Sequence, residues 1–533
     1  MTEDMKRVYI LFLLMVLNSF AGSIGLSAQQ QGIVERVYIS TDKSTYVAGD
    51  RIWCSLFCFS VEGESASLSD FSSTVYLELQ TNKQVVHTAK MALIGGRGAG
   101  AIDLPPTLPT GNYRLVGYTA QNKNEEGFTP CGGVVTIYNT ITSERVDDGV
   151  EMVQNDGLSF AKAENEDRYD EVFVQLPSVE VKRGKEFKFS LNNALPESVT
   201  LSLSIYNKDP YKYVIDAGIV NYWEQITQTT PGNVGVATLP DYEGEIIRFK
   251  AQKGESDQLF VSFPGQYGEY FVADVQENGD AFIITPNIYG DRDMVCDGVE
   301  SLEVVDPFIK KVVGGIPKLV MNPSMENLLL SRSFSMQVEK RFDADTLYEM
   351  LPVRSNILLD NEKVVYILDE YTRFPKMEEV LVEYVKEIVV KTVKRKKQIS
   401  ITLTPENNGY RTSQESLVMI DGVPVLDQQK IFDFDPLLVE RLEIYPNFFS
   451  IGNVIYRGVA NFITYKKDLS GFSFDNSTKI LPFKGCKVPL AYTGGGIRED
   501  DTYPDYRQTI YWHPLLDVEG RGKIELRGIA PLY

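Results

Sequence analysis

The sequence predicts a mainly β, multi-domain protein in which tandem β-sandwiches are followed by one α+β domain. The chain has 533 residues, which is too long for a single hydrophobic core, so several domains are expected. As far as residue 342, short runs alternate apolar with polar side chains, and clusters of Gly, Pro, Asn and Asp separate them. This pattern is typical of sandwich strands and their turns. From Asp343 onward helical and strand patterns mix, which indicates an α+β module.

Composition and charge exclude some classes of protein. Hydrophobic residues make up 43% of the chain and charged residues 24%, as in ordinary folded proteins, so a disordered protein is not expected. The chain holds 53 Lys and Arg against 73 Asp and Glu, a net charge of −20. Because that charge repels phosphate backbones, no nucleic-acid partner is predicted.

The N-terminus has the pattern of a secretory signal peptide. Lys6 and Arg7 precede an apolar run at Val8–Leu17, and Leu26–Ala28 supplies a small-residue cleavage site. Ten apolar residues span roughly 15 Å as a helix, half of a bilayer's ~30 Å core, so a membrane anchor is not expected. The sequence therefore predicts an exported protein, periplasmic or associated with an outer membrane, with no transmembrane span of its own.

Turn clusters and one polar run divide the rest of the chain. Glu164–Asp170 is expected to link two sandwiches, and Met377–Val385 spaces apolar residues as a helix does. The tail is expected to form two strands of a further sandwich that stops early. The predicted units are a signal peptide at 1–28, a first sandwich at 33–140, a second sandwich at 165–235, a third β domain at 236–342, an α+β domain at 343–470 and a partial β tail at 471–533.

The first sandwich carries a family resemblance. Ile39–Trp53 resembles the entry strand of the macroglobulin-type domain of alpha-2-macroglobulins, with Asp42 in a polar turn and Tyr46 packed inward. Gly98–Pro105 and Leu108–Leu115 match later strands of that domain in the same order. The resemblance implies a macroglobulin-type β-sandwich at 33–140. The thioester signature of that family, Gly-Cys-Gly-Glu-Gln, is absent, so covalent trapping of proteases is not expected.

Later segments resemble other modules. Phe260–Val295 is similar to carboxypeptidase-regulatory-like or immunoglobulin-like sandwiches. Ser416–Val425 resembles the plug of TonB-dependent receptors, where a hydrophobic strand meets an Asp-Gly turn, and Phe434–Tyr445 and Gly452–Lys466 continue that plug. Asp369–Leu381 resembles the linker of Bacteroidota proteins that join macroglobulin-type and plug-like domains. These resemblances imply a Bacteroidota cell-envelope protein with a plug-like domain.

The plug-like domain is not expected to have a receptor barrel. Eight strands of ~9–11 residues need about 72–88 residues before any turns are counted. Only 67 residues follow Lys466. We therefore expect the domain to contact another protein instead of filling a barrel of its own.

Catalytic and metal-binding patterns are missing from the sequence. The two histidines, His87 and His513, are far apart, and no Gly-x-Ser-x-Gly elbow, His-Glu-x-x-His or paired Cys-x-x-Cys occurs. Gly95–Gly100 is not followed by a helix-forming segment that could hold a phosphate. We predict that the protein is not an enzyme and has no catalytic residue, cofactor, metal ion or recognisable small-molecule substrate.

The five cysteines allow two interpretations. In an oxidising compartment some could pair, but an odd number leaves at least one thiol free. Cys54 and Cys58 are ~13 Å apart along one strand, too far to bridge each other. They are either small buried apolar residues, or one of them bridges to Cys131.

These observations predict a non-catalytic interaction or assembly protein of the cell envelope. The resemblance to plugs implies an association with TonB-dependent uptake and an outer-membrane or periplasmic protein partner. The alternatives are a macroglobulin-like protease-interacting or defence protein without a thioester, and an enzyme whose site the sequence does not reveal. The residues expected to dock on the partner are those of the plug-like strand and its turn, Leu417, Met419, Ile420, Asp421 and Gly422.

Overall fold

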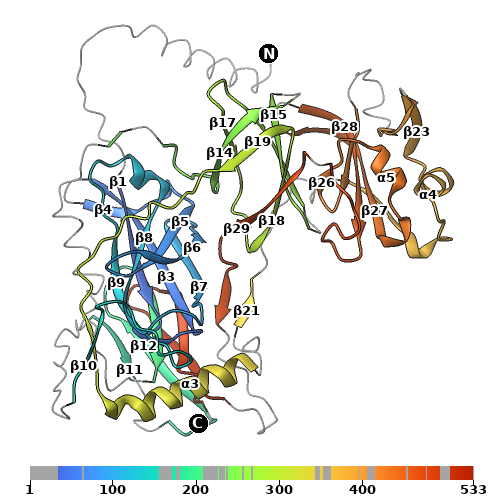
Figure 1. The fold of residues 1–533 in the computed structure, drawn as a ribbon. Helices are drawn as coiled ribbons and strands as arrows, with labels where there is room; N and C mark the ends of the chain where they lie inside the picture. Colours follow the sequence, from blue (N-terminus) through green and yellow to red (C-terminus); the bar gives the residue numbers. More distant parts are fainter. Residues whose placement is uncertain are drawn as a thin grey trace.

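The structure is a computed structural model, and its strands form three sandwiches and one α+β domain (Figure 1). With 52% strand and 11% helix it confirms the mainly β prediction. The predicted signal peptide and the predicted linker at 164–170 lie outside the described residues. No helix in the described part is long and apolar enough to cross a membrane. The structure describes residues 34–62, 65–154, 171–175, 181–207, 222, 226, 234–235, 238–254, 257–265, 268–341, 348–351, 362–393, 395–404, 415–451, 454–475, 477–492 and 505–531.

The first sandwich packs two sheets around one apolar core. Val75, Leu77 and Leu79 alternate inward from one strand, as the period of two requires. Tyr46 is also buried in this core, and its hydroxyl donates to Asp42 across the predicted polar turn. One sheet contains β1 (Val34–Thr41), β3 (Arg51–Glu62), β4 (Ser65–Leu68) and β7 (Arg97–Asp103), and the other has the order β2 (Thr45–Val47), β9 (Cys131–Tyr138), β8 (Gly111–Tyr118), β5 (Thr74–Gln80) and β6 (Val85–Ala92).

The second sandwich is completed by the C-terminal tail. We expected the tail to start a further sandwich, but its strands pair antiparallel with strands more than 300 residues earlier, Leu191 opposite Ile524 and Val199 opposite Val518. Apolar side chains from both segments share one small core, which explains the pairing because neither segment can bury its apolar face alone. The strands are β11 (Val172–Gln175), β12 (Glu186–Asn193) and β32 (Lys523–Ile529) in one sheet, and β13 (Val199–Tyr206) and β31 (Thr509–Val518) in the other.

The third sandwich also borrows a strand from later in the chain. One sheet has the order β17 (Asp280–Ile284), β14 (Ile246–Lys253) and β19 (Val299–Val304). The other has the order β16 (Glu269–Asp274), β15 (Gln258–Phe263), β18 (Asp291–Asp297) and β29 (Lys479–Lys484). Because β29 follows the α+β domain in the chain, that domain is an insertion between β19 and β29.

An extended strap, residues 305–318, returns from the third sandwich along the first. Polar groups on the outer face of the first sandwich satisfy its backbone: Glu78 accepts from the Lys310 amide at 2.8 Å, and the Tyr118 hydroxyl accepts from the Ile309 amide at 2.7 Å. Beyond the strap, β20 (Leu319–Met321) pairs with β10 (Val150–Met152), and α3 (Glu326–Arg341) runs beside the first sandwich (Figure 1).

The α+β domain lies at the far end of the molecule, beyond the third sandwich (Figure 1). Its sheet has the order β22 (Val364–Ile367), β27 (Val439–Ile451), β28 (Val454–Thr464), β25 (Leu417–Ile420) and β26 (Val423–Pro424). One face of the sheet shares a core with α4 (Met377–Tyr384), α5 (Gln429–Asp433) and the hairpin β23 (Ile388–Val393) and β24 (Lys396–Ile401). The other face packs on Tyr270 of the third sandwich. A short antiparallel pair joins β21 (Tyr348–Met350), which follows α3 and precedes the α+β domain, to β30 (Leu490–Tyr492), which follows β29.

Candidate functional site

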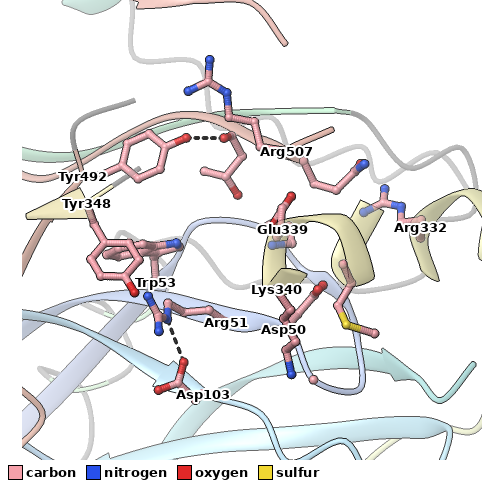
Figure 2. A pocket seen from close by; sticks show the side chains of 15 residues that line it. Asp50, Arg51, Trp53, Asp103, Arg332, Glu339, Lys340, Tyr348, Tyr492 and Arg507 are labelled. Atoms are coloured by element: carbon pink, nitrogen blue, oxygen red, sulfur yellow. Dashed lines mark hydrogen bonds and ion pairs between the residues drawn. The ribbon is translucent and has the colours of Figure 1, made fainter. Parts of the chain in front are cut away.

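A polar cavity of about 230 Å³ lies where the first sandwich, α3, the β21–β30 pair and the start of β31 meet (Figure 2). Segments distant in sequence build it, from Lys43 to Thr509, so the cavity exists only when the nested domains are assembled. We call it the junction cavity. Its lining residues are Lys43, Gly49, Asp50, Arg51, Trp53, Asp103, Arg332, Met336, Glu339, Lys340, Tyr348, Tyr492, Arg507, Gln508 and Thr509.

The buried carboxylate of Asp42 holds two sides of the cavity together. It accepts hydrogen bonds from the Tyr46 hydroxyl at 2.8 Å and the Trp53 amide at 3.1 Å, both within the first sandwich. It also accepts from the Thr509 hydroxyl of β31. A buried carboxylate needs such donors, so Asp42 ties the C-terminal strand to the first sandwich.

The cavity brings acidic and basic side chains together in a poorly solvated place. Burial is the main cause that raises the pKa of Asp50, against the attraction of Lys43. Burial and then repulsion by Asp50 raise the pKa of Glu339 to about 7, although Lys43 and Arg507 oppose the shift. Arg507 is itself ion-paired with Asp505 at 3.3 Å. Glu339 therefore changes charge near neutral pH.

Aromatic rings form the opposite wall of the cavity. The Trp53 ring lies 5.9 Å from Tyr348, 5.6 Å from Tyr492 and 4.9 Å from Trp512, centroid to centroid. The guanidinium of Arg51 lies 4.5 Å from the centroid of the Tyr348 ring, where cation–π attraction holds it. Arg51 is also ion-paired with Asp103 at 2.7 Å (Figure 2).

The arrangement can hold charged groups close together. The described lining contains no histidine or cysteine, and the hydroxyl of Thr509 is bonded to Asp42. No group of His, Cys, Asp and Glu among the described residues is arranged to bind a metal ion.

The Glu339 carboxyl makes stability depend on pH in a defined direction. Glutamate ordinarily titrates near 4.3, so between about pH 4.5 and 7 the folded protein holds a proton that the unfolded chain has lost. Stability therefore falls as pH rises through this window. We expect Glu339→Gln to raise stability by no more than about 1 kcal/mol at pH 5 and by up to about 3 kcal/mol at pH 8, since one pKa unit is worth ~1.4 kcal/mol.

Urea unfolding of both proteins at pH 5 and pH 8 measures this effect. The exposed Glu300, changed to Gln, is the matched control and should behave like the wild type at both values. If the wild type and Glu339→Gln lose stability equally between pH 5 and pH 8, Glu339 is not the group that titrates.

The five predicted docking residues lie in the interior of the molecule. Leu417 and Met419 pack against Tyr270 of the third sandwich, while Ile420 enters the core of the α+β domain. Asp421 is fully buried and accepts hydrogen bonds from the Thr464 amide and hydroxyl, both at 2.7 Å, and from the Leu469 amide. Gly422 faces the backbone of Gly268. The third sandwich covers Leu417, Met419 and Gly422, whereas Ile420 and Asp421 are buried within the α+β domain itself. The docking role of the five residues stays a prediction.

The structure also shows where the two histidines and the five cysteines lie. The ring nitrogens Nε2 of His87 and Nδ1 of His513 are buried, and burial lowers the pKa of both imidazoles. All five cysteines carry free thiols, so neither Cys54 nor Cys58 bridges to Cys131 in the structure. Burial raises the pKa of Cys54 well above its usual value, which suits a small apolar core residue.

Sequence reasoning missed most of the junction cavity. It singled out Asp42 only as part of a polar turn. Arg332, Glu339 and Arg507 carry no local motif, because their meeting depends on the return of the tail to the first sandwich.

Comparisons with known proteins give partial likenesses. No protein-family model matches the sequence, and no curated protein does. Trypsin-activated alpha-2-macroglobulin from Escherichia coli is 9% identical over 53% of this chain and 17% of its own length, with a TM-score of 0.16. Salmonella alpha-2-macroglobulin reacted with methylamine is 8% identical over 93% of this chain and 27% of its own length, with the same TM-score. A CARDB domain from Pyrococcus furiosus, crystallised with di-metal ions, is 12% identical over 20% of this chain and 96% of its own length, with a TM-score of 0.15.

The chain thus spans well under a third of either macroglobulin. At these TM-scores the superpositions carry no functional argument, so a function for this chain has to be inferred from its own residues.

Proposed function

We propose that the protein is a non-catalytic interaction protein of a Bacteroidota-type cell envelope. Its plug-like α+β domain docks on an outer-membrane or periplasmic protein partner, in association with TonB-dependent uptake. The sandwiches serve as the arm that presents this domain. Sequence resemblance supports the envelope setting, and the edge of the plug-like sheet supports the docking.

The observation that carries the proposal is the edge strand β22. Among the described strands it pairs only with β27, so its other edge has no strand partner in that part of the chain. Tyr366 points into the domain core, whereas Val365 and Ile367 point outward and are each 42% exposed. An edge strand with outward apolar residues is a template for pairing with another chain.

Further apolar groups adjoin this edge. The Tyr465 hydroxyl donates to Asp369, which follows β22 closely, and the Tyr465 amide donates to the Leu438 carbonyl at 3.2 Å. The Tyr465 and Leu438 side chains are both exposed. We call Val365, Ile367, Leu438 and Tyr465 the edge patch. A grouped apolar patch of this kind is typical of a protein contact surface.

The position of the domain fits this role. One face of its sheet is covered by its own helices, and the third sandwich covers part of the other face. The β22 side of the sheet lies outside that contact, where a partner can reach it. Because the domain is inserted between β19 and β29, two chain connections and the Tyr270 contact hold it on the arm.

A crosslinked pull-down from a Bacteroidota envelope tests the proposal. The bait is the tagged chain, and the variant is Val365→Lys with Ile367→Lys, which places two charges on the β22 edge. The control is Val382→Lys, at a residue of α4 that is 65% exposed. We expect the wild type and the control to recover an outer-membrane or periplasmic protein that the variant loses.

Two results would contradict this proposal. Equal recovery by the variant would show that the β22 edge does not bind the partner. Recovery of proteases in place of an envelope protein would favour the alternative, a macroglobulin-like protease-interacting protein.

A further inference from the structure

A second surface, unrelated to the plug-like domain, lies between the first and third sandwiches. It is a cleft of about 600 Å³, within the size range of ligand-binding pockets. We call it the basic cleft. Its walls are β6, the start of β14, the end of β19 with the strap, and β29. Its charged lining residues include Lys90, Lys123, Glu245, Arg248, Lys310 and Lys484.

The edge of β6, and not one of its faces, borders the cleft. Val85, Val86, His87 and Thr88 are successive residues, and all of them line it. Successive residues of a strand point to opposite faces, so only the edge can present all four. In the described sheet β6 is the terminal strand after β5. The open edge over Val85–Ala89 is roughly 17 Å long at ~3.4 Å per residue, enough for a short extended peptide.

The same edge already accepts a chain segment at its far end. The carbonyl of Lys90 accepts from the Lys487 amide at 2.7 Å, and Lys90 forms a parallel bridge with Cys486. Backbone groups two residues apart in a strand point to the same side. The amide and carbonyl of Thr88 therefore point along that edge into the cleft, where they can pair with an added strand.

The cleft is positively charged although the whole chain is strongly negative. Lys90 is paired with Glu245 at 2.6 Å, and Lys310 is paired with Asp306. Lys123, Arg248 and Lys484 also line the cleft, and within the described residues none of the three is ion-paired. These three cations attract a negatively charged ligand.

We propose that the basic cleft binds an acidic peptide segment of a partner, in extended form, as a strand added to the open edge of β6. Main-chain hydrogen bonds to β6 would hold the peptide, and carboxylates on alternate residues would meet Arg248 and Lys484. This inference goes beyond docking by the plug-like domain and uses a different surface.

His87 gives the proposal a specific reporter. It lines the cleft, and burial followed by the charges of Lys487 and Lys484 lowers the pKa of its imidazole. An acidic peptide beside Lys484 should raise that pKa. The chain has only two histidines, and His513 lies in the second sandwich on β31, so it serves as an internal control in the same NMR spectrum.

The test uses a fluorescein-labelled six-residue peptide of alternating Glu and Val, with blocked ends, and measures its binding by fluorescence anisotropy. Two comparison peptides carry Lys in place of Glu, or backbone N-methyl groups on alternate residues. The protein variants are Arg248→Glu with Lys484→Glu, and a control with the same charge change on exposed strands of the second sandwich, Lys188→Glu with Lys523→Glu.

We expect the Glu–Val peptide to bind the wild type and the control, and to bind at least tenfold more weakly to the cleft variant. N-methylation should weaken binding at least tenfold, because it removes main-chain donors, and the His87 signal should move while the His513 signal stays. The variant Val365→Lys with Ile367→Lys should bind the peptide normally, which separates this test from that of the plug-like domain.

Three results would overturn the proposal. Equal binding of the N-methylated peptide would mean simple charge attraction without strand addition. Binding of inorganic polyphosphate without binding of the peptide would assign the cleft to a small anion. No binding of the Glu–Val peptide at millimolar concentration would leave the cleft without the proposed occupant.

Discussion

Replacing Lys90 with methionine is expected to destabilise the protein by about 3–5 kcal/mol, the usual cost of removing one partner of a buried ion pair. Lys90 and Glu245 are only 3% and 5% exposed, and their charged groups are 2.6 Å apart. The pair joins β6 of the first sandwich to the start of β14 in the third. Without Lys90, the carboxylate of Glu245 is left buried without its ion-pair partner, with only the weaker attraction of Lys123, so the contact between the two sandwiches weakens.

Burial raises the pKa of Glu245 and Lys90 opposes that rise. In Lys90→Met the carboxyl should therefore take up a proton more readily, and the loss of stability should shrink at acidic pH. Urea unfolding at two pH values measures both effects. The double variant Lys90→Met with Glu245→Leu removes both charges and should recover most of the stability. A single variant as stable as the wild type at pH 7 would show that the pair is solvated.

A methyl group at Gly422 is expected to separate the α+β domain from the third sandwich. Gly422 has a φ of +81°, which favours glycine, and an added Cβ would lie 2.2 Å from the Cα of Gly268. The atoms that the added Cβ would meet belong to the backbone of Gly268, which cannot move aside as a side chain can. The adjacent hydrogen bond from the Gly265 amide to the Asp421 carbonyl, at 2.9 Å, would be lost with the contact.

Gly422→Ala should therefore cost several-fold more than the ~1 kcal/mol of the backbone strain alone. Gly127→Ala is the matched control, because its φ is +76° and no atom lies within 4 Å of an added Cβ. Hydrogen exchange of β16 and β25 should become faster in Gly422→Ala and stay unchanged in the control. Equal stability of the two variants would mean that the two domains do not pack at this turn.

Local patterns predicted the parts of the fold that local physics determines. The Asp42 turn and the inward Tyr46 follow from residues close in sequence, and the structure places both as expected. The Asp421-Gly422 turn is similar: both residues have positive φ, which two-residue hairpins require and Asp-Gly supplies. Alternation likewise predicted the mainly β class.

Sequence patterns could not predict which distant segments pair. The apolar face of β31 would suit any unfinished sandwich, and nothing near Thr509 specifies β13 as its partner over 300 residues earlier. The junction cavity depends on that pairing, so the sequence could not predict that Glu339 and Arg507 line the same cavity. The hydrophobic strand at Leu417 was expected to meet a partner, but a strand of apolar residues is equally what a domain uses to pack on its neighbour.

Photocrosslinking from the β22 edge in living cells would test docking by the plug-like domain without purification. A photoreactive amino acid replaces Ile367, and the same residue at Val382 on α4 is the control. We expect a crosslink from position 367 to an outer-membrane or periplasmic protein, absent from position 382 and lost when Val365 is also changed to Lys. If both positions give the same products, or if position 367 gives none, the plug-like domain does not dock through this edge.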